Sequence, residues 1–283
     1  MSVSEGLSQW LRQVGADDLQ TETIMGGGCI NRTSAIRTKS GKTCFLKQNA
    51  QAPTAMFAAE ARSLQILAST KTLRIPQVYY QDENCLLLEY LPSSGRQSDY
   101  WELFGRQLAR LHSHTSDHFG LDFDTFCGTT CQSNSPNLNG HDFFYHQRLM
   151  PLGEMALARG LWASADMDRL ECLGGKLTNL IPPQPASMLH GDLWSGNAHT
   201  GPEGEPVLID PAHYYGWREA ELGMTQLFGG FPPAFYAAYE ETWPLEPGWR
   251  GRLDIYNLYH LLNHLVLFGG GYLGQVRAVL HRY

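Results

Sequence analysis

The segment 190–197, which reads HGDLWSGN, constrains this chain more than any other part of the sequence. It places a histidine, an aspartate and an asparagine in one short loop. A strand is predicted just before this loop, and another predicted strand at 206–209 ends at Asp210. We therefore expect a fold that brings Asp210 back beside the loop.

The spacing H-x-D-x-x-x-x-N is typical of the catalytic loop of the protein-kinase-like fold, with Gly191 where protein kinases carry arginine. In phosphoryl transfer to an alcohol, one carboxylate orients the attacking hydroxyl, while amide and carboxylate oxygens hold the metal ions on the nucleotide phosphates. We assign Asp192 as the catalytic residue that accepts the hydroxyl proton. Asn197 and Asp210 are assigned as Mg²⁺ ligands, because this ion prefers hard oxygen donors. His190 is assigned a structural role, holding the loop by hydrogen bonds.

The residue after Asp210 is Pro211, and this order carries its own prediction. A proline biases the preceding residue towards an extended backbone. We therefore expect an extended and rather rigid conformation at Asp210.

Hydrophobic periodicity divides the chain into two parts. Strands are predicted at 22–26, 33–38, 43–48, 77–80 and 85–89, with helices at 4–14 and 53–69. After residue 98 the pattern is mainly helical, with helices predicted at 141–158 and 164–180 and through most of 217–282. Pro92 and Gly95 interrupt both patterns. The sequence thus predicts an α+β, two-lobed protein-kinase-like fold. A small antiparallel-sheet N-lobe (1–91) would bind the nucleotide, and a larger, mostly helical C-lobe (92–283) would carry catalysis and substrate binding.

Three glycines and an ion pair are candidates for holding a nucleotide in the first part. Gly26, Gly27 and Gly28 lie between two predicted strands, where backbone amides can approach a phosphate closely, although a plain turn explains them equally well. Lys47 ends the third predicted strand, and Glu60 is the one acid in the helix that follows. An isolated lysine often only solubilises an edge strand. The matching acid favours instead the Lys–Glu pair that kinases assemble at ATP phosphates.

The apolar strand at 85–89 runs into the predicted junction between the lobes. Main-chain groups of Glu89, Tyr90 and Leu91 are predicted to meet the edge of the adenine base, since apolar pockets with few polar groups suit such a ligand. An ordinary core strand would give the same sequence pattern.

Composition excludes several other classes of protein. The net charge is −7, which disfavours a nucleic-acid partner. The 6 cysteines form no C-x-x-C pair, so reduced thiols are expected. The first residues lack the pattern of a secretory signal, and no apolar stretch is long enough for a membrane span. We expect a cytoplasmic protein with no membrane partner.

Further motifs extend along nearly the whole chain. They read GGGCI at 26–30, FLK at 45–47, FG at 119–120, QSN at 132–134, FF at 143–144, RL at 148–149, DPA at 210–212, YYG at 214–216 and LFGGFP at 227–232. Together with Glu60 and the loop at 190–197, they resemble the fructosamine/ketosamine kinase family. That family has the aminoglycoside phosphotransferase-like, protein-kinase-like fold.

The resemblance implies ATP-dependent phosphorylation of the 3-hydroxyl of a ketosamine, with ATP and Mg²⁺ as cofactors. The acceptor would be a small-molecule ketosamine or a glycated lysine side chain, and the reaction a deglycation repair step. Trp194, Gln132 and Asn134 are assigned to the substrate. Trp194 can stack on a sugar face, although a packing role beneath the loop is an equal alternative.

One residue departs from the family pattern: Trp217 follows Tyr215-Gly216 where the family usually has histidine. If that histidine serves the site, substrate preference or rate is altered; if it only packs, the change is neutral. Cys29, next to the glycines, is a candidate for oxidation that disturbs nucleotide binding. Another small-molecule kinase of this fold, of the aminoglycoside or choline type, and a non-catalytic nucleotide-binding module remain alternatives. The preferred sugar and the oligomeric state are left open.

Overall fold

The computed structural model describes residues 5–13, 19–25, 30–39 and 41–283. The chain folds into two compact units. The first comprises residues 1–100 and 198–211, and the second comprises 101–197 and 212–283. The sequence predicted one boundary at residue 91, whereas the first unit extends to Tyr100 and also takes in a later segment.

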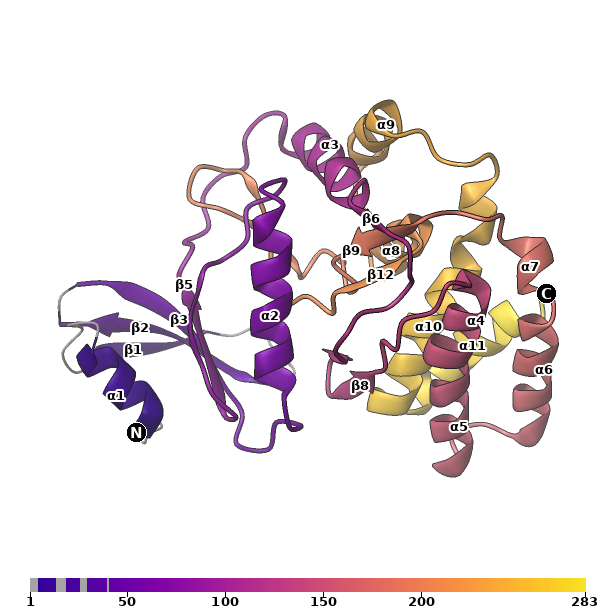
Figure 1. Ribbon diagram of the computed structural model, residues 1–283, viewed down its shortest axis with the longest axis horizontal. Coiled ribbons are helices and arrows are strands. Elements are labelled where there is room, and N and C mark those ends of the chain that lie inside the picture. The colour runs from indigo at the N-terminus through magenta and orange to yellow at the C-terminus, as the bar shows by residue number, and fades with distance from the viewer. Residues whose placement is uncertain (1–4, 14–18, 26–29, 40) are drawn as a thin grey trace. The chain divides into compact units, whose positions relative to one another are not determined.

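The first unit contains an antiparallel sheet of five strands (Figure 1). Its strands are β1 (Leu19–Met25), β2 (Arg32–Thr38), β3 (Thr43–Gln48), β4 (Val78–Gln81) and β5 (Cys85–Glu89). They lie in the order β1-β2-β3-β5-β4, and each neighbouring pair is antiparallel. The predicted small antiparallel sheet is therefore confirmed. The bounds of each predicted strand differ from those of the observed strand by three residues at most.

The two faces of this sheet have different partners. On β3, alternate side chains point to opposite faces. Cys44 and Leu46 belong to an apolar core that includes Leu7 of helix α1 (Glu5–Gln13). Lys47 points the other way, towards Glu60 of helix α2 (Met56–Ser69). The strand period thus places the lysine on the α2 face.

A hairpin from much later in the chain completes the first unit. Strands β10 (Ala198–Thr200) and β11 (Pro206–Leu208) pair with each other. The amide of Leu208 donates to the carbonyl of Arg74 at 3.0 Å. The hydroxyl of Ser94 donates to the carbonyl of Gly201 at 2.8 Å. These bonds attach the hairpin to the first unit and deliver Asp210 to it.

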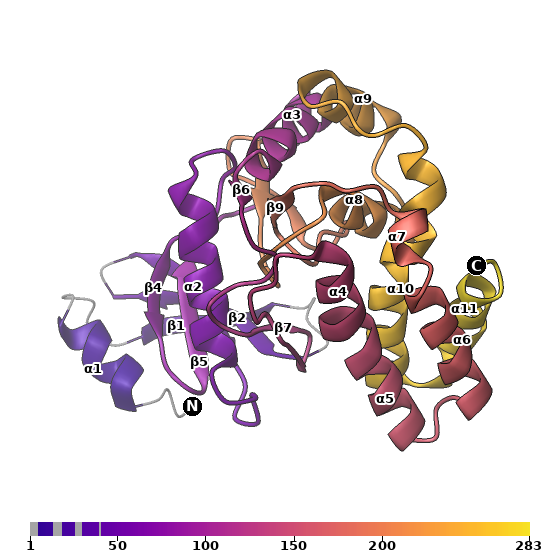
Figure 2. The ribbon, with the colours of Figure 1, turned by 45° about the vertical axis from the view of Figure 1, so that its right-hand side comes forward.

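The second unit is mostly helical (Figures 1 and 2). Its helices are α3 (Tyr100–His112), α4 (Gly140–Phe144), the π-helix η1 (Tyr145–Leu149), α5 (Met150–Ala158), α6 (Ser164–Gly174), α7 (Leu177–Leu180), α8 (Arg218–Leu227), α9 (Pro233–Thr242), α10 (Trp249–Phe268), the 3₁₀ helix η2 (Gly270–Tyr272) and α11 (Leu273–Leu280). Helix α10 contacts α5, α8 and α11 and forms the centre of this unit. Among the described residues, none of the helices is long and apolar enough to cross a membrane.

Five short strands also belong to the second unit. Strands β6 (Thr115–Ser116), β9 (Ala186–Leu189) and β12 (Tyr214–Gly216) form one antiparallel sheet, and β7 (Thr125–Cys127) pairs with β8 (Thr130–Gln132). Four of these were not predicted, because two or three residues are too few to show a period. Strand β9 leads directly into the segment 190–197.

Candidate active site

Lys47 lies between two carboxylates in the first unit. Its Nζ is 2.5 Å from Glu60 Oε1 and 2.5 Å from Asp210 Oδ1. The lysine side chain is only 2% exposed, whereas that of Asp210 is 47% exposed. The structure therefore brings together three residues that are far apart in the sequence.

The electrostatics of this triad keep the lysine charged. Burial opposes the charge on Lys47, but the negative charges of Asp210 and Glu60 outweigh it and raise the pKa of the lysine above its usual range. Burial raises the pKa of Glu60, and Lys47 opposes that shift. A charged, immobilised lysine is suited to binding phosphate oxygens.

The backbone at Asp210 differs from the expectation. Its φ is +56°, in the left-handed region, so the predicted extended conformation is wrong. Aspartate is among the residues that tolerate this region best. Backbone conformations of this kind persist where the surroundings fix them. Here the carboxylate is fixed by its bond to Lys47.

The other nucleotide assignments have different outcomes. Gly26, Gly27 and Gly28, like Cys29, lie outside the described residues. The amide of Glu89 donates to the carbonyl of Gln77 at 2.8 Å. The carbonyl of Leu91 accepts a bond from His199 Nε2 at 2.9 Å. Two main-chain groups at this strand end are thus already bonded, and the adenine contact of Glu89, Tyr90 and Leu91 stays a prediction.

In the second unit, a buried glutamate holds the start of the loop at 190–197. Glu221 Oε2 accepts the amide of His190 at 2.9 Å, and its Oε1 accepts the amide of Gly191 at 2.6 Å. The same carboxylate lies 2.9 Å from His112 Nε2, and His112 Nδ1 lies 2.8 Å from the Tyr239 hydroxyl. Burial alone would raise the pKa of Glu221, but the bond with His112, nearby histidine charge and the amide of Gly191 lower it overall.

This role of Glu221 and His112 was not predicted from the sequence. The available signal was an acid at the start of the helix-forming segment that follows the DPA motif. Acids are almost never fully buried unless they are paired. A buried acid close to this motif therefore indicates that its carboxylate bonds to nearby groups of the loop.

Gly191 occupies a position that requires glycine. Its φ is +90°, and a Cβ placed on it would lie 2.0 Å from the carbonyl oxygen of Ala212. This close approach of two backbones explains why glycine stands where protein kinases have arginine.

Asp192 and Asn197 are bonded to each other. Asn197 Nδ2 donates to the backbone carbonyl of Asp192 at 2.8 Å and to its Oδ2 at 3.1 Å. The amide of Asp192 lies 3.3 Å from His190 Nδ1, and His190 is fully buried. The two functional side chains of the loop are therefore fixed relative to each other, and the histidine supports the turn.

The residues assigned to magnesium fit that ion chemically. Because Asn197 uses its Nδ2 as a donor to Asp192, its carbonyl Oδ1 is the atom that would bind a cation. Asp210 bonds Lys47 through Oδ1 and is half-exposed, so Oδ2 can serve a cation. Amide and carboxylate oxygens are the hard donors that Mg²⁺ takes.

Trp194 is 37% exposed, and its ring packs edge-on against Phe228 with centroids 6.4 Å apart. It is therefore not buried beneath the loop, and one part of the ring is available to a ligand. Gln132 and Asn134, in contrast, are buried. Gln132 Nε2 donates to the Ala212 carbonyl at 3.0 Å. The side-chain amides of Gln132 and Asn134 thus form hydrogen bonds within the protein interior. Their contact with substrate stays a prediction.

The Asn134 amide oxygen accepts a bond from Arg148 at 2.6 Å.

Trp217 is also buried, and its ring packs against Phe119, His141, Phe144 and Tyr256. In this chain the ring of Trp217 therefore serves packing.

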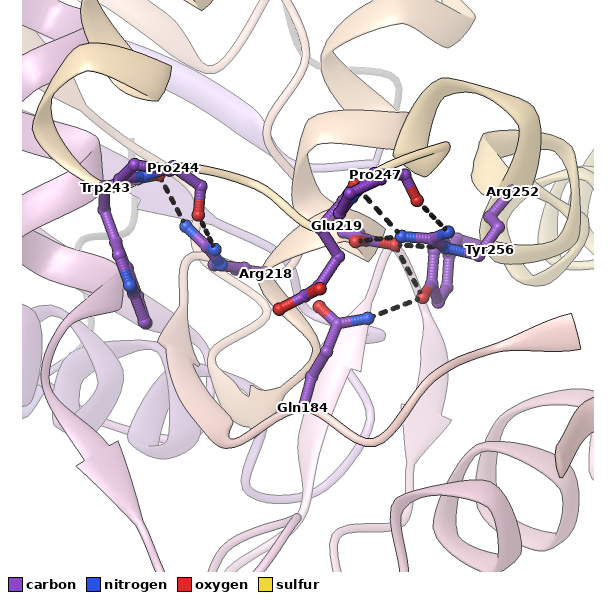
Figure 3. Close-up of polar contacts among 9 residues, drawn as sticks. Gln184, Arg218, Glu219, Trp243, Pro244, Pro247, Arg252 and Tyr256 are labelled. Atoms are coloured by element: carbon purple, nitrogen blue, oxygen red, sulfur yellow. Dashed lines mark hydrogen bonds and ion pairs between the residues drawn. The ribbon is translucent and has the colours of Figure 1, made fainter.

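Helix α8 is anchored by a second buried acid (Figure 3). Glu219 accepts two bonds from Arg252, at 2.6 and 2.9 Å, and one from the Tyr256 hydroxyl at 3.0 Å. At the start of the helix, Arg218 donates to the backbone carbonyl of Trp243 at 2.9 Å. These contacts fix the helix that carries Glu221.

The fold and these groups define a class of protein. The antiparallel sheet with its Lys–Glu pair, and the helical unit with its H-x-D-x-x-x-x-N loop, are those of a phosphotransferase of the protein-kinase-like fold. A macrolide 2′-phosphotransferase from Brachybacterium faecium shares this fold, with a TM-score of 0.61 and 17% identity over 99% of both chains. At that identity the likeness shows the fold alone.

Comparison with nearer relatives gives the family. The family model described as fructosamine kinase matches residues 3–283, and the chain belongs to this family. A Synechocystis protein assigned as a ketoamine kinase is 40% identical over 93% of this chain and 90% of its own length. The chloroplastic protein-ribulosamine 3-kinase of Arabidopsis thaliana is 33% identical over 99% and 85%. A solved structure from Thermobifida fusca, assigned as a fructosamine-3-kinase, has a TM-score of 0.89 and 30% identity, covering 99% and 98% of the two chains.

Proposed function

We propose that this protein transfers the γ-phosphoryl group of ATP to the 3-hydroxyl of ketosamines, which are amines that carry a 1-deoxyketose. The observation that carries the proposal is the pair of Asp192 and Asn197, bonded at 3.1 Å in a loop with the kinase spacing. Family membership and relatives assigned as ketoamine and ribulosamine kinases support the choice of acceptor.

The roles of the side chains follow from their chemistry. The Asp192 carboxylate orients the acceptor hydroxyl and takes its proton, as the corresponding aspartate does in kinases. Lys47, charged and held by Glu60, binds phosphate oxygens of the nucleotide. Asn197 and Asp210 hold Mg²⁺, which when bound neutralises charge on the phosphates. The half-exposed ring of Trp194 packs on the sugar.

The product explains a repair function. C3 lies next to the C2 carbonyl, and loss of a proton from C1 gives a 1,2-enaminol that can expel the C3 phosphate as inorganic phosphate. Water then hydrolyses the resulting C1 imine and separates the sugar fragment, as a dicarbonyl, from the amine. We propose that small ketosamines and glycated lysine side chains are acceptors, and that the protein acts in the cytoplasm.

A screen with defined acceptors tests this proposal. ADP release is measured with a panel of 1-deoxyketose adducts of lysine that differ in the sugar, and the phosphorylated oxygen of the product is located by NMR. We expect release with at least one ketosamine and phosphate on O3. Absence of turnover with the whole panel, or phosphate on another oxygen, would contradict the proposal.

A variant separates catalysis from binding. Asp192→Ala is expected to lower kcat by about 10²- to 10⁴-fold, because the proton acceptor is lost. ATP binding should persist, since Lys47 and Glu60 are intact. Near-normal turnover in Asp192→Ala would remove the assignment of the base.

A further inference from the structure

A thiol, a carboxylate and an imidazole meet within the second unit. The ligand atoms of Cys127 on β7, Asp192 in the loop and His260 on α10 all lie within 4.8 Å of one another. Cys127 and His260 are both buried, with exposures of 3% and 5%. We call this group the thiol–imidazole cluster.

We propose that the thiol–imidazole cluster is a binding site for a borderline-soft divalent cation such as Zn²⁺, and that the bound ion inhibits the enzyme by occupying Asp192. Thiolate and imidazole select such ions over Mg²⁺, which takes oxygen ligands. Three protein ligands leave a fourth tetrahedral position for water. This site shares Asp192 with catalysis but uses neither Asn197 nor Asp210.

A second observation supports a ligand here. Nδ1 of His260 is buried and has no hydrogen-bond partner among the described residues. A buried, unpaired polar atom is energetically costly and calls for an explanation. Burial lowers the pKa of His260 to about 3, so its ring is neutral at physiological pH, the form that binds metals. The side chain is thus ready to act as a ligand.

The surroundings of Cys127 suit a bound thiolate. Asn263 Nδ2 donates to the Cys127 carbonyl at 3.1 Å and fixes the end of β7. Burial and the charge of Asp192 raise the pKa of the thiol well above its usual range, while Tyr259 and Asn263 oppose this shift. Without a metal the thiol is therefore protonated and unreactive at neutral pH. Metal binding replaces that proton, which leaves to solvent, and no group changes oxidation state.

The geometry requires only a small contraction. In a tetrahedral zinc site, ligand atoms at about 2.0–2.3 Å from the ion are about 3.5 Å apart. The separations here are at most 4.8 Å, so small side-chain rotations would close them. The contraction and the thiol proton together favour a site of modest affinity, which suits reversible inhibition.

Binding is tested first without any substrate. Co²⁺ alone is added to the full chain, and the absorption spectrum is followed for tetrahedral d–d bands and for sulfur-to-cobalt charge transfer. We expect one equivalent of Co²⁺ to produce both, and Zn²⁺ to displace it. Cys127→Ser should lose the charge-transfer band. Cys131→Ser, which removes an exposed thiol on the neighbouring strand β8, is the matched control and should keep it.

Inhibition is tested second, with ATP and Mg²⁺ in excess. We expect Zn²⁺ to inhibit the wild type and Cys131→Ser equally, and Cys127→Ser to need about a hundredfold more Zn²⁺. His260→Gln is the second variant and should likewise need more Zn²⁺ for inhibition. It keeps the test decisive if Cys127→Ser does not fold. Absence of a charge-transfer band, its survival in Cys127→Ser, or equal zinc sensitivity of all variants would overturn the inference.

The inhibition step rests on the proposed function, whereas the metal site does not. Co²⁺ bound through Cys127 in a chain that phosphorylates no ketosamine would keep the site and reject the function. Turnover of a ketosamine by a chain without the cobalt bands would do the reverse.

Discussion

At the scale of single residues, Gly191 shows how one missing side chain permits the conformation of the loop at 190–197. We predict that Gly191→Ala lowers kcat and costs at least about 1–2 kcal/mol of stability, since a Cβ strains a backbone with positive φ. It would also meet Ala212, with Cβ and the carbonyl oxygen 2.0 Å apart. Thermal unfolding and steady-state kinetics measure both effects.

Gly251→Ala is the matched control for this prediction. Gly251 lies in helix α10, and a Cβ there meets nothing within 4 Å. That variant should be neutral or slightly stabilising, because alanine is the better helix former. Equal behaviour of Gly191→Ala and Gly251→Ala would show that the loop tolerates a side chain.

What the sequence could predict about the site depends on how each residue type reveals its role. Glu60 was found because it is the one acid in a helix opposite a strand lysine, and the structure pairs it with Lys47. Gln132 gave no comparable signal, because an amide can bond substrate or protein equally well. Its burial follows from β7, β8 and Ala212, which meet only in three dimensions.

At the scale of elements, helix α8 supports the loop at 190–197, since it carries Glu221. We predict that Glu221→Gln costs about 1–3 kcal/mol of stability, because a buried amide cannot replace both oxygens as acceptors. It should also lower kcat by loosening the loop that carries Asp192. The control is Glu240→Gln, at a more exposed pair, which should stay within about 0.5 kcal/mol of wild type.

Glu221 of helix α8 should also make the free energy of unfolding depend on pH. The pKa of Glu221 is lowered by folding from its ordinary 4.5. Its charge therefore contributes stability that is complete above about pH 4.5 and is lost as pH falls through the lower folded pKa. The difference in unfolding free energy between wild type and Glu221→Gln, measured by urea titration, should shrink below pH 4.5. A difference that is constant across this range would contradict the lowered pKa.

The other buried acid of α8 allows a test of its anchoring. Arg252→Met is expected to cost about 3–5 kcal/mol, because Glu219 would keep a buried charge with no cationic partner. The double variant Glu219→Leu/Arg252→Met should recover most of that loss, since two apolar side chains can replace a buried pair. The free energies of unfolding of the two variants are measured by urea titration. A double variant that is as unstable as Arg252→Met would show that the ion pair itself anchors the helix.

At the scale of the whole molecule, the chain is less simply divided than its sequence suggests. Periodicity indicated a sheet-rich part followed by a helical part, and both exist. It could not show that residues 198–211 return to the first unit, because that return depends on bonds such as Leu208 to Arg74, which are distant in sequence. Strand β11 matches the strand predicted at 206–209, whereas its partner β10, with three residues, was too short to be predicted.

This return places Lys47, Glu60 and Asp210 in one unit and Asp192 in the other. The proposed roles in nucleotide binding and in proton acceptance can therefore be tested separately by stability measurements. ATP with Mg²⁺ at about a hundred times its Kd should add about 2.7 kcal/mol, which raises Tm by roughly 5 °C. Calorimetry should show the full shift in Asp192→Ala. Lys47→Met should show no such shift in Tm. Its kcat at saturating ATP should fall by at least ~10²-fold, because the lysine cation that would bind the phosphates has been removed. A full shift in Lys47→Met would mean that the buried lysine serves the fold and not the nucleotide.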